Sequence, residues 1–164
     1  MILSIDDSVG GIMRTLRARG MDQDTLVILT SDGGHLWGEH GLIDKRCTYE
    51  ESIRIPLLAR YPMGIKTDST CDAIVANIDI APTLLELAGV SPPPLLDGTS
   101  LAGLLRDPRM TDSWRSELLY EYYWEPAFPQ TPTTFALRGR RCDPARVQGK
   151  PRFKLAAGRW NRAI

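Results

Sequence analysis

The chain has 164 residues, of which 43% are hydrophobic and 24% are charged. This is enough for one globular domain with its own core, but too little for two domains of ordinary size. No run of about 18 apolar residues occurs, which predicts that no helix spans a membrane. The formal net charge is zero, yet residues 138–164 contain nine Arg or Lys and one acid, Asp143.

The amino terminus argues against a signal peptide, and the cysteines argue against a disulfide-rich domain. The first residues carry two early acids and no basic segment before an apolar core, so we expect no signal peptide. Cys47, Cys71 and Cys142 form no Cys-x-x-Cys pair, and their odd number argues against a complete disulfide framework.

Residues 4–19 predict an amphipathic helix that ends at Gly20. Its apolar side chains recur at helical spacing, at Ile5, Val9, Ile12, Met13 and Leu16. Residues 25–31 then predict a buried strand, because the run is short, apolar and rich in β-branched residues. A helix followed by a short loop and a strand is a unit of an α/β sheet.

Further elements are predicted along the rest of the chain. Residues 53–61 favour an edge strand or a strand start, because Pro56 has no N–H for a ladder. Residues 79–88 and 100–106 favour helices, and residues 118–124 and 134–137 favour strands.

The strand predicted at residues 25–31 runs directly into Asp32-Gly33-Gly34-His35. Ligands of open α/β sheets bind just beyond the carboxyl ends of the strands, so Asp32 is well placed to hold a metal. Asp-Gly is also an ordinary turn, which is the plainer interpretation of the same residues.

The stretch from Thr30 to Tyr61, TSDGGHLWGEHGLIDKRCTYEESIRIPLLARY, resembles the sulfatase family of the alkaline-phosphatase-like superfamily. In that family a strand ends in Asp-Asn or Asp-His, followed by Gly-Glu-His-Gly, a Lys and Tyr-Glu-Glu-Ser-Ile-Arg-(Ile/Val)-Pro-Leu. The resemblance covers roughly residues 1–139. It implies an α/β fold with a mixed sheet flanked by helices, present only as its later strands and helices.

The resemblance implies roles for three residues. Asp32 matches a carboxylate that helps to hold Ca²⁺ or Mg²⁺ through hard oxygen ligands. Lys45 matches the lysine that contacts sulfate, where an ammonium stabilises developing negative charge. His40 matches a loop residue that contacts the substrate or leaving group, or only shapes the loop. Without the motif, Asp32 would be a turn residue and Lys45 a solvated surface residue.

Gly33 departs from the family, which has Asn or His at this position. Glycine offers no side chain to a metal or a substrate. Three alternatives follow: a water fills the place, His35 leans in, or the metal binds weakly.

The nucleophile motif of the family is absent from the sequence. Sulfatases use a formylglycine made from a Cys or Ser in Cys/Ser-x-Pro-Ser/Ala-x-Arg, and this chain contains no such motif. The paired aspartates near the family's amino terminus are absent as well. Because loss of a nucleophile removes nearly all rate acceleration, we expect the chain to be inactive alone and to lack an N-terminal half.

The implied function is that of a sulfuric ester hydrolase fragment, with metal-assisted cleavage of sulfate esters on a sugar or an aryl sulfate. One alternative is a phosphoryl or phosphonate ester hydrolase of the same superfamily. The other is a non-catalytic remnant, or a partner subunit that completes an upstream polypeptide. Relatives are commonly periplasmic, secreted or lysosomal, which leaves the localisation of this chain open.

After Gly139 the family pattern stops. Residues 140–164 show neither helical nor strand periodicity and are strongly basic. A basic tail can bind nucleic acid or a membrane, whereas an abrupt change of composition is typical of a shifted reading frame. We therefore expect a partial sulfatase domain at 1–139 and an atypical tail at 140–164, frameshifted or disordered, with no nucleic-acid partner.

Overall fold

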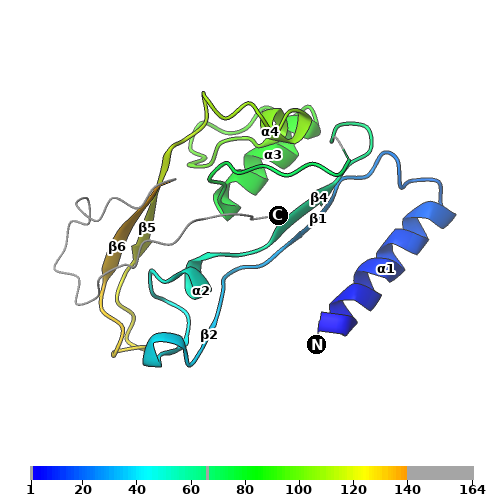
Figure 1. The fold of residues 1–164 in the computed structure, drawn as a ribbon. Coiled ribbons are helices and arrows are strands. Elements are labelled where there is room, and N and C mark those ends of the chain that lie inside the picture. The colour runs from blue at the N-terminus through cyan, green and yellow to red at the C-terminus, as the bar shows by residue number, and fades with distance from the viewer. Residues whose placement is uncertain (1, 66, 140–164) are drawn as a thin grey trace.

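The computed structural model describes residues 2–65 and 67–139, so the tail predicted at 140–164 lies outside the described residues. Within these ranges the strands pair as three two-stranded antiparallel sheets. Figure 1 shows the β5–β6 pair at one side, helix α1 at the other and the β1–β4 pair between them. No helix in the described part is long and apolar enough to cross a membrane.

Helix α1 (Ile2–Ala18) confirms the helix predicted at residues 4–19. Gly20 follows it with a φ of 67°, the left-handed conformation in which glycine commonly ends a helix. No residue of α1 is buried, and the side chains of Ile5 and Ile12 are exposed. Val9, Met13 and Leu16 are half-buried, so the apolar stripe of α1 is only partly covered by the described residues.

Strands β1 (Val27–Thr30) and β4 (Leu57–Arg60) confirm the two apolar runs predicted as strands. The prediction that the first strand is buried was wrong, because β1 is half-buried and Thr30 is exposed. They pair antiparallel, with Val27 opposite Arg60 and Thr30 opposite Leu57. Pro56 stands just before β4, where its missing N–H costs no ladder bond. Arg60 also donates to the carbonyl oxygen of Asp22 at 2.7 Å, which ties the turn after α1 to the sheet.

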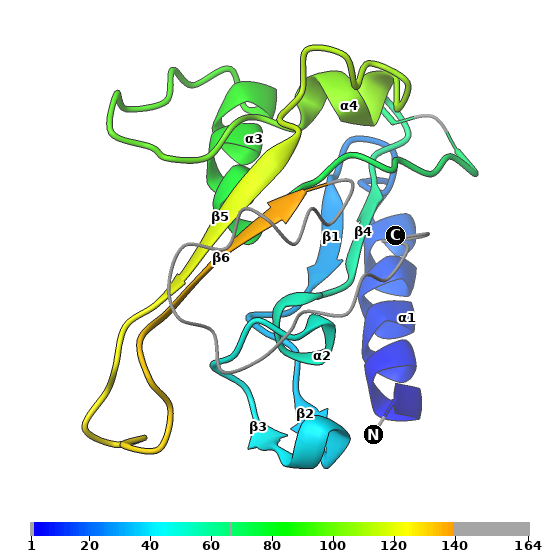
Figure 2. The same ribbon diagram turned by 60° about the vertical axis from the view of Figure 1, so that its left-hand side comes forward.

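A small hairpin follows β1. Strands β2 (Leu36–Trp37) and β3 (Ile43–Asp44) pair across the 3₁₀ turn η1 (Glu39–Gly41), and the short helix α2 (Glu50–Ile53) comes next. Figure 2 shows this hairpin beside α2 at the lower end of the molecule. The sequence did not predict these elements, because two-residue strands are too short to display a hydrophobic period.

The helical part contains the 3₁₀ turn η2 (Asn77–Asp79) and helices α3 (Ile80–Leu87) and α4 (Ala102–Arg106). Both α-helices were predicted from the sequence, and both are confirmed. Three of the most buried apolar side chains lie at the start of α4, at Leu101, Ala102 and Leu104.

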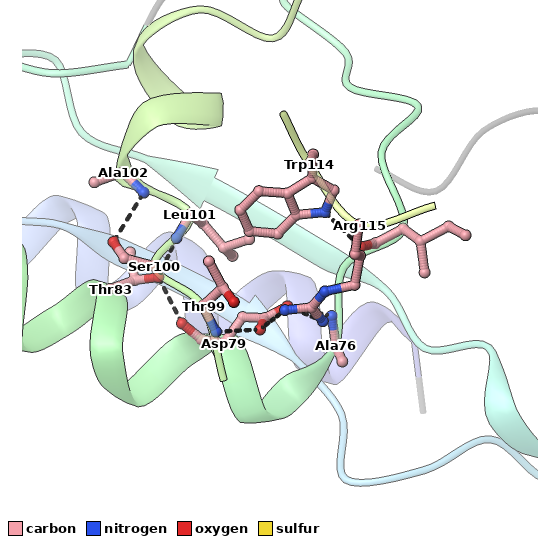
Figure 3. A network of polar contacts seen from close by, with 10 residues as sticks. Ala76, Asp79, Thr83, Thr99, Ser100, Leu101, Ala102, Trp114 and Arg115 are labelled. Carbon is pink, nitrogen blue, oxygen red and sulfur yellow. Dashed lines mark hydrogen bonds and ion pairs between the residues drawn. The ribbon is translucent and has the colours of Figure 1, made fainter. Parts of the chain in front are cut away.

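A buried carboxylate organises this helical part (Figure 3). Asp79 is fully buried and accepts two hydrogen bonds from the Arg115 guanidinium, at 2.5 and 2.9 Å. It also accepts from the backbone N–H groups of Ala76 and Thr99, each at 2.8 Å. A buried charge is tolerated when it is paired and hydrogen-bonded in this way. Asp79 thus connects three separate segments of the chain.

Thr83 extends the same network from the next turn of α3. Its hydroxyl donates to the Asp79 carbonyl oxygen at 2.6 Å and accepts from the N–H of Leu101 at 2.7 Å. The Thr83 side chain therefore fixes the start of α4 against α3, as Figure 3 shows.

Strands β5 (Glu117–Tyr122) and β6 (Thr134–Gly139) form the longest antiparallel pair, with Glu117 opposite Gly139 and Tyr122 opposite Thr134. Both strands were predicted. Tyr122 and Ala136 are buried on one face, whereas Leu119 is 57% exposed on the other. Alternating exposure of this kind is what a half-buried antiparallel pair produces.

Candidate functional site

Asp32 and Lys45 lie together at the end of β1. Asp32 follows the strand after one residue, and Lys45 follows β3 directly. The Lys45 Nζ donates a hydrogen bond to Asp32 Oδ2 at 2.9 Å. The Asp32 side chain is 85% exposed and that of Lys45 35%. The structure thus brings together the two residues that the motif singled out, while their metal and sulfate roles stay predictions.

The charge of Lys45 acts directly on Asp32. The hydrogen bond from the ammonium, and then its positive charge, hold the pKa of the Asp32 carboxyl below its ordinary value of 3.8. Because an opposite charge at this distance favours the ionised form, Asp32 is a carboxylate at neutral pH.

The backbone of the Asp32 turn is seated on α2. The N–H of Gly34 donates to the Ser52 carbonyl oxygen at 2.9 Å, and the Ser31 hydroxyl donates to the Gly33 carbonyl oxygen at 2.9 Å. A β-carbon at position 34 would overlap the Glu51 carbonyl oxygen, so only glycine fits this approach. The turn that carries Asp32 is therefore fixed by contacts on both sides.

His40 lies at the tip of the β2–β3 hairpin with a left-handed φ of 58°. Its ring stacks on that of Tyr49, with centroids 3.8 Å apart and planes 8° apart. Its Nε2 lies 3.4 Å from Glu51 Oε2. The His40 side chain remains 41% exposed, so it is held in place yet open to a ligand.

The space beside Gly33 is taken by Lys45. A β-carbon at position 33 would meet Lys45 Cδ at 3.2 Å and Nζ at 3.4 Å. The His35 ring lies against Trp37 instead, with centroids 4.4 Å apart. None of the three alternatives considered for position 33 was that the Lys45 side chain lies across it.

A cavity of about 600 Å³ opens next to this pair. Its walls come from the end of β1, the segment 71–77 and the inner face of the β5–β6 pair. Most of its lining is apolar, and its charged side chains include Asp32, Lys45 and Arg46. Concave, mostly apolar sites with a few converging polar groups are typical of ligand pockets.

Arg46 is a site residue that the sequence analysis did not identify. Its guanidinium lies 3.6 Å from Glu125 Oε1 and 3.3 Å from the centre of the Phe128 ring. It also pairs with Asp44 at 2.5 Å. Arg46 therefore links the β2–β3 hairpin to the loop after β5. The adjacent Lys45-Arg46 pair was the available signal for this position.

The described residues do not form a complete divalent-cation site. Ca²⁺ takes roughly six to eight oxygen ligands. No group of three His, Cys, Asp or Glu suitable for a metal occurs among residues 2–65 and 67–139. Asp32 offers one carboxylate, already bonded to an ammonium, and Gly33 offers no side chain. The Ca²⁺ or Mg²⁺ implied by the resemblance is not supported by these residues alone.

Comparison with known proteins places this geometry in a family. Residues 38–157 match the family model described as N-sulphoglucosamine sulphohydrolase, C-terminal. The N-acetylglucosamine-6-O-sulfatase of Bacteroides thetaiotaomicron is 42% identical over 127 residues, 77% of this chain and 23% of that protein. The human N-acetylglucosamine-6-sulfatase is 42% identical over 126 residues, 76% of this chain and 22% of that protein. This chain thus spans about a quarter of the length of these relatives.

Solved structures agree with the sequence relatives. One, described as a complex with its substrate D-glucosamine-2-N,6-O-disulfate, superposes with a TM-score of 0.79 at 39% identity, covering 84% of this chain and 28% of that one. The phosphonate monoester hydrolase of Agrobacterium radiobacter gives 0.76 at 26% identity, covering 86% and 30%. The expected alkaline-phosphatase-like α/β fold, present in part, is confirmed.

The family match includes both Lys45 and His40. It also runs to residue 157, beyond Gly139, where the sequence analysis had placed the end of the family pattern. The sequence motif and the fold therefore indicate the same family. The chain belongs to the N-sulphoglucosamine sulphohydrolase C-terminal family, among the sulfatases.

Proposed function

We propose that this chain contributes the Asp32–Lys45 side of a sulfuric ester hydrolase site that acts on a sulfated sugar. The observation that carries the proposal is the 2.9 Å contact between Lys45 and Asp32 at the end of β1, beside a cavity. A sulfated glucosamine is the favoured substrate class, because the relatives at 42% identity are named for N-acetylglucosamine sulfates.

Each residue has a defined part in this proposal. The Lys45 ammonium binds a sulfate oxygen and stabilises the negative charge that grows on it during ester cleavage. His40, held by Tyr49 and Glu51, contacts the leaving-group side of the substrate. Asp32 orients Lys45 through their hydrogen bond. In the family a formylglycine nucleophile and a calcium ion supply the remaining chemistry, and neither is assigned to residues of this chain.

A chimaera tests the proposal. The matching segment of the B. thetaiotaomicron N-acetylglucosamine-6-O-sulfatase is replaced by the 127 residues of this chain that align with it. We expect the chimaera to hydrolyse 6-sulfated N-acetylglucosamine. Lys45→Ala in the chimaera should lower kcat on the order of 10²- to 10³-fold, the usual effect of losing one charge-stabilising donor.

The control is Arg109→Ala, which removes a cation that is 89% exposed and pairs with nearby Asp107. Arg109→Ala should leave kcat unchanged. A folded chimaera in which Lys45→Ala and Arg109→Ala behave alike would contradict the role of Lys45.

The second candidate is phosphonate monoester hydrolysis. It is favoured by the structural match at a TM-score of 0.76 to such an enzyme, although the identity is only 26%. The same chimaera, assayed with a phenyl phosphonate monoester, separates the two. Hydrolysis of the phosphonate ester without hydrolysis of the sulfate ester would favour this alternative.

A further inference from the structure

The position of Lys45 is set by the absence of a side chain at Gly33. The Lys45 alkyl chain lies across the α-carbon of Gly33, so that an added β-carbon would stand 3.2 Å from Cδ and 3.8 Å from Cε. The 3.2 Å contact is tighter than ordinary van der Waals packing, and the 3.8 Å contact is an ordinary one. A residue larger than glycine would have to share the space in which the lysine side chain now lies.

From this position the ammonium reaches Asp32. The Nζ lies 2.9 Å from Asp32 Oδ2, and the same nitrogen lies 3.4 Å from the β-carbon site of Gly33. The approach to Asp32 therefore passes over Gly33. An Asn side chain at position 33, as in the family, would occupy the path along which Lys45 closes.

The carboxylate that would serve a metal is thus already bonded to a cation from its own chain. The described residues supply no second and third carboxylate or imidazole to compete for it. Asp32 is exposed, so solvent and ions can reach the pair from outside.

We propose that Gly33 makes the Lys45 ammonium, rather than a divalent metal, the resident cation at Asp32 in this chain. The inference deepens the proposed function, because it states which positive charge faces the oxyanion of a substrate at this site. Gly33 is then a positioning residue that acts through Lys45. Its replacement by Asn should open the pair.

Lysine labelling on the full 164-residue chain tests this without any assay of hydrolysis. The rate at which acetic anhydride modifies Lys45 is measured by mass spectrometry, with the peptides of Lys66, Lys150 and Lys154 as references for reagent dose. Modification requires that the Lys45 nitrogen leave Asp32. Asp32→Asn should therefore raise the rate about two- to fivefold, the range for opening an exposed ion pair.

Gly33→Asn should raise the Lys45 rate by a similar factor, with Asp32 still present. The matched control is Gly103→Asn, because a β-carbon there meets no atom within 4 Å. Gly103→Asn should leave the rate unchanged, and circular dichroism should show that all variants keep the wild-type helix content. Millimolar calcium chloride should not change the wild-type rate.

Three results would overturn the inference. An unchanged rate in Asp32→Asn would mean that the pair is not closed in solution. An unchanged rate in folded Gly33→Asn would mean that Gly33 does not control it. Faster labelling of the wild-type chain on addition of calcium would mean that the metal displaces Lys45. Because none of these results depends on turnover, they are distinct from failure of the chimaera to cleave a sulfate ester.

Discussion

The sequence predicted which residues belong to the site, but not how their side chains are arranged. The motif identified Asp32 and Lys45, which lie 13 residues apart, and the hairpin between them returns the chain so that they meet. It could not indicate that Lys45 would lie across Gly33, because that depends on the rotamer of a long side chain. Arg46 was missed because the sequence alone does not distinguish it from an ordinary surface arginine. Its contact with Phe128 becomes evident only in the structure.

Asp79 was predicted only as a residue near a helix start. Its partner Arg115 lies 36 residues away, and such long-range pairs leave no local pattern. Removing one partner of a buried ion pair leaves an uncompensated charge. We predict that Asp79→Asn lowers the free energy of unfolding by about 3 kcal/mol.

Urea denaturation followed by circular dichroism measures this change. The control is Asp97→Asn at an exposed position, which should stay within about 0.5 kcal/mol of the wild type. Equal midpoints for the two variants would show that the Asp79–Arg115 pair contributes no net stability.

Glu50 gives the chain a predictable response to pH. Burial raises the pKa of the Glu50 carboxyl above its ordinary value of 4.5, and this outweighs the opposing effect of Arg138 at 3.3 Å. A carboxyl with a raised folded-state pKa contributes stability that is full below pH 4.5 and is lost as the pH rises through the raised value.

Glu50→Gln should remove this dependence. Between a pH just below 4.5 and neutral pH, the stability of the wild type should therefore fall relative to that of Glu50→Gln. Chemical denaturation of both proteins at the two pH values gives the difference directly. An identical pH response in the two proteins would be evidence against the raised pKa.

Elements with a clear period were predicted well, and short ones were not. Helix α1 follows from apolar spacing, and strands β1 and β4 follow from short apolar runs; α3, α4, β5 and β6 were predicted as well. The β2–β3 hairpin and α2 were not predicted, because their form is set by left-handed turns and by contacts with the Asp32 loop. These irregular elements carry the site residues Lys45 and His40.

The seating of the Asp32 turn on α2 should be sensitive to one carbon atom. Gly34→Ala places a β-carbon into the Glu51 carbonyl oxygen, so the backbone must move and the bond from Gly34 to Ser52 must lengthen. We predict a loss of about 1 to 3 kcal/mol in the free energy of unfolding, the usual cost of overpacking.

Gly103→Ala is the matched substitution, because its added β-carbon meets open space within a helix. It should be neutral or stabilising by up to about 1 kcal/mol, since alanine is the better helix former. Thermal unfolding of the two variants compares them. A Gly34→Ala protein as stable as Gly103→Ala would show that the turn is not tightly seated.

Helix α1 should be the least protected of the helices among the described residues. None of its 17 residues is buried, whereas Pro82 and Thr83 of α3 are. Isolated helices are only marginally stable in water, and α1 has little packing to stabilise it. Its backbone amide hydrogen bonds should therefore open often. Hydrogen exchange followed by mass spectrometry should show residues 2–18 exchanging well before residues 80–87. Equal protection of both would contradict this.

At the scale of the whole molecule, the motif predicted the family, and the comparisons confirmed it. The arrangement of small sheets was not predictable, because strand order depends on pairings between segments far apart in the chain. Figures 1 and 2 show the β5–β6 pair and the β1–β4 pair as separate ladders.

The 164-residue chain alone should not turn over an aryl sulfate, with or without calcium. The sequence contains no Cys/Ser-x-Pro-Ser/Ala-x-Arg motif, and the described residues form no metal cluster. A chromogenic aryl sulfate assay at high protein concentration measures this. Turnover that survives purification and is abolished by Lys45→Ala would refute the expectation.

Each described strand pairs with a single neighbour, so within residues 2–65 and 67–139 no third strand extends any of the three ladders. Unpaired edge strands can form hydrogen bonds with strands of other chains. Concentrated solutions of this polypeptide will therefore self-associate through intermolecular β-pairing. A short peptide designed to pair with the edge of β1 opposite β4 should delay the onset of turbidity.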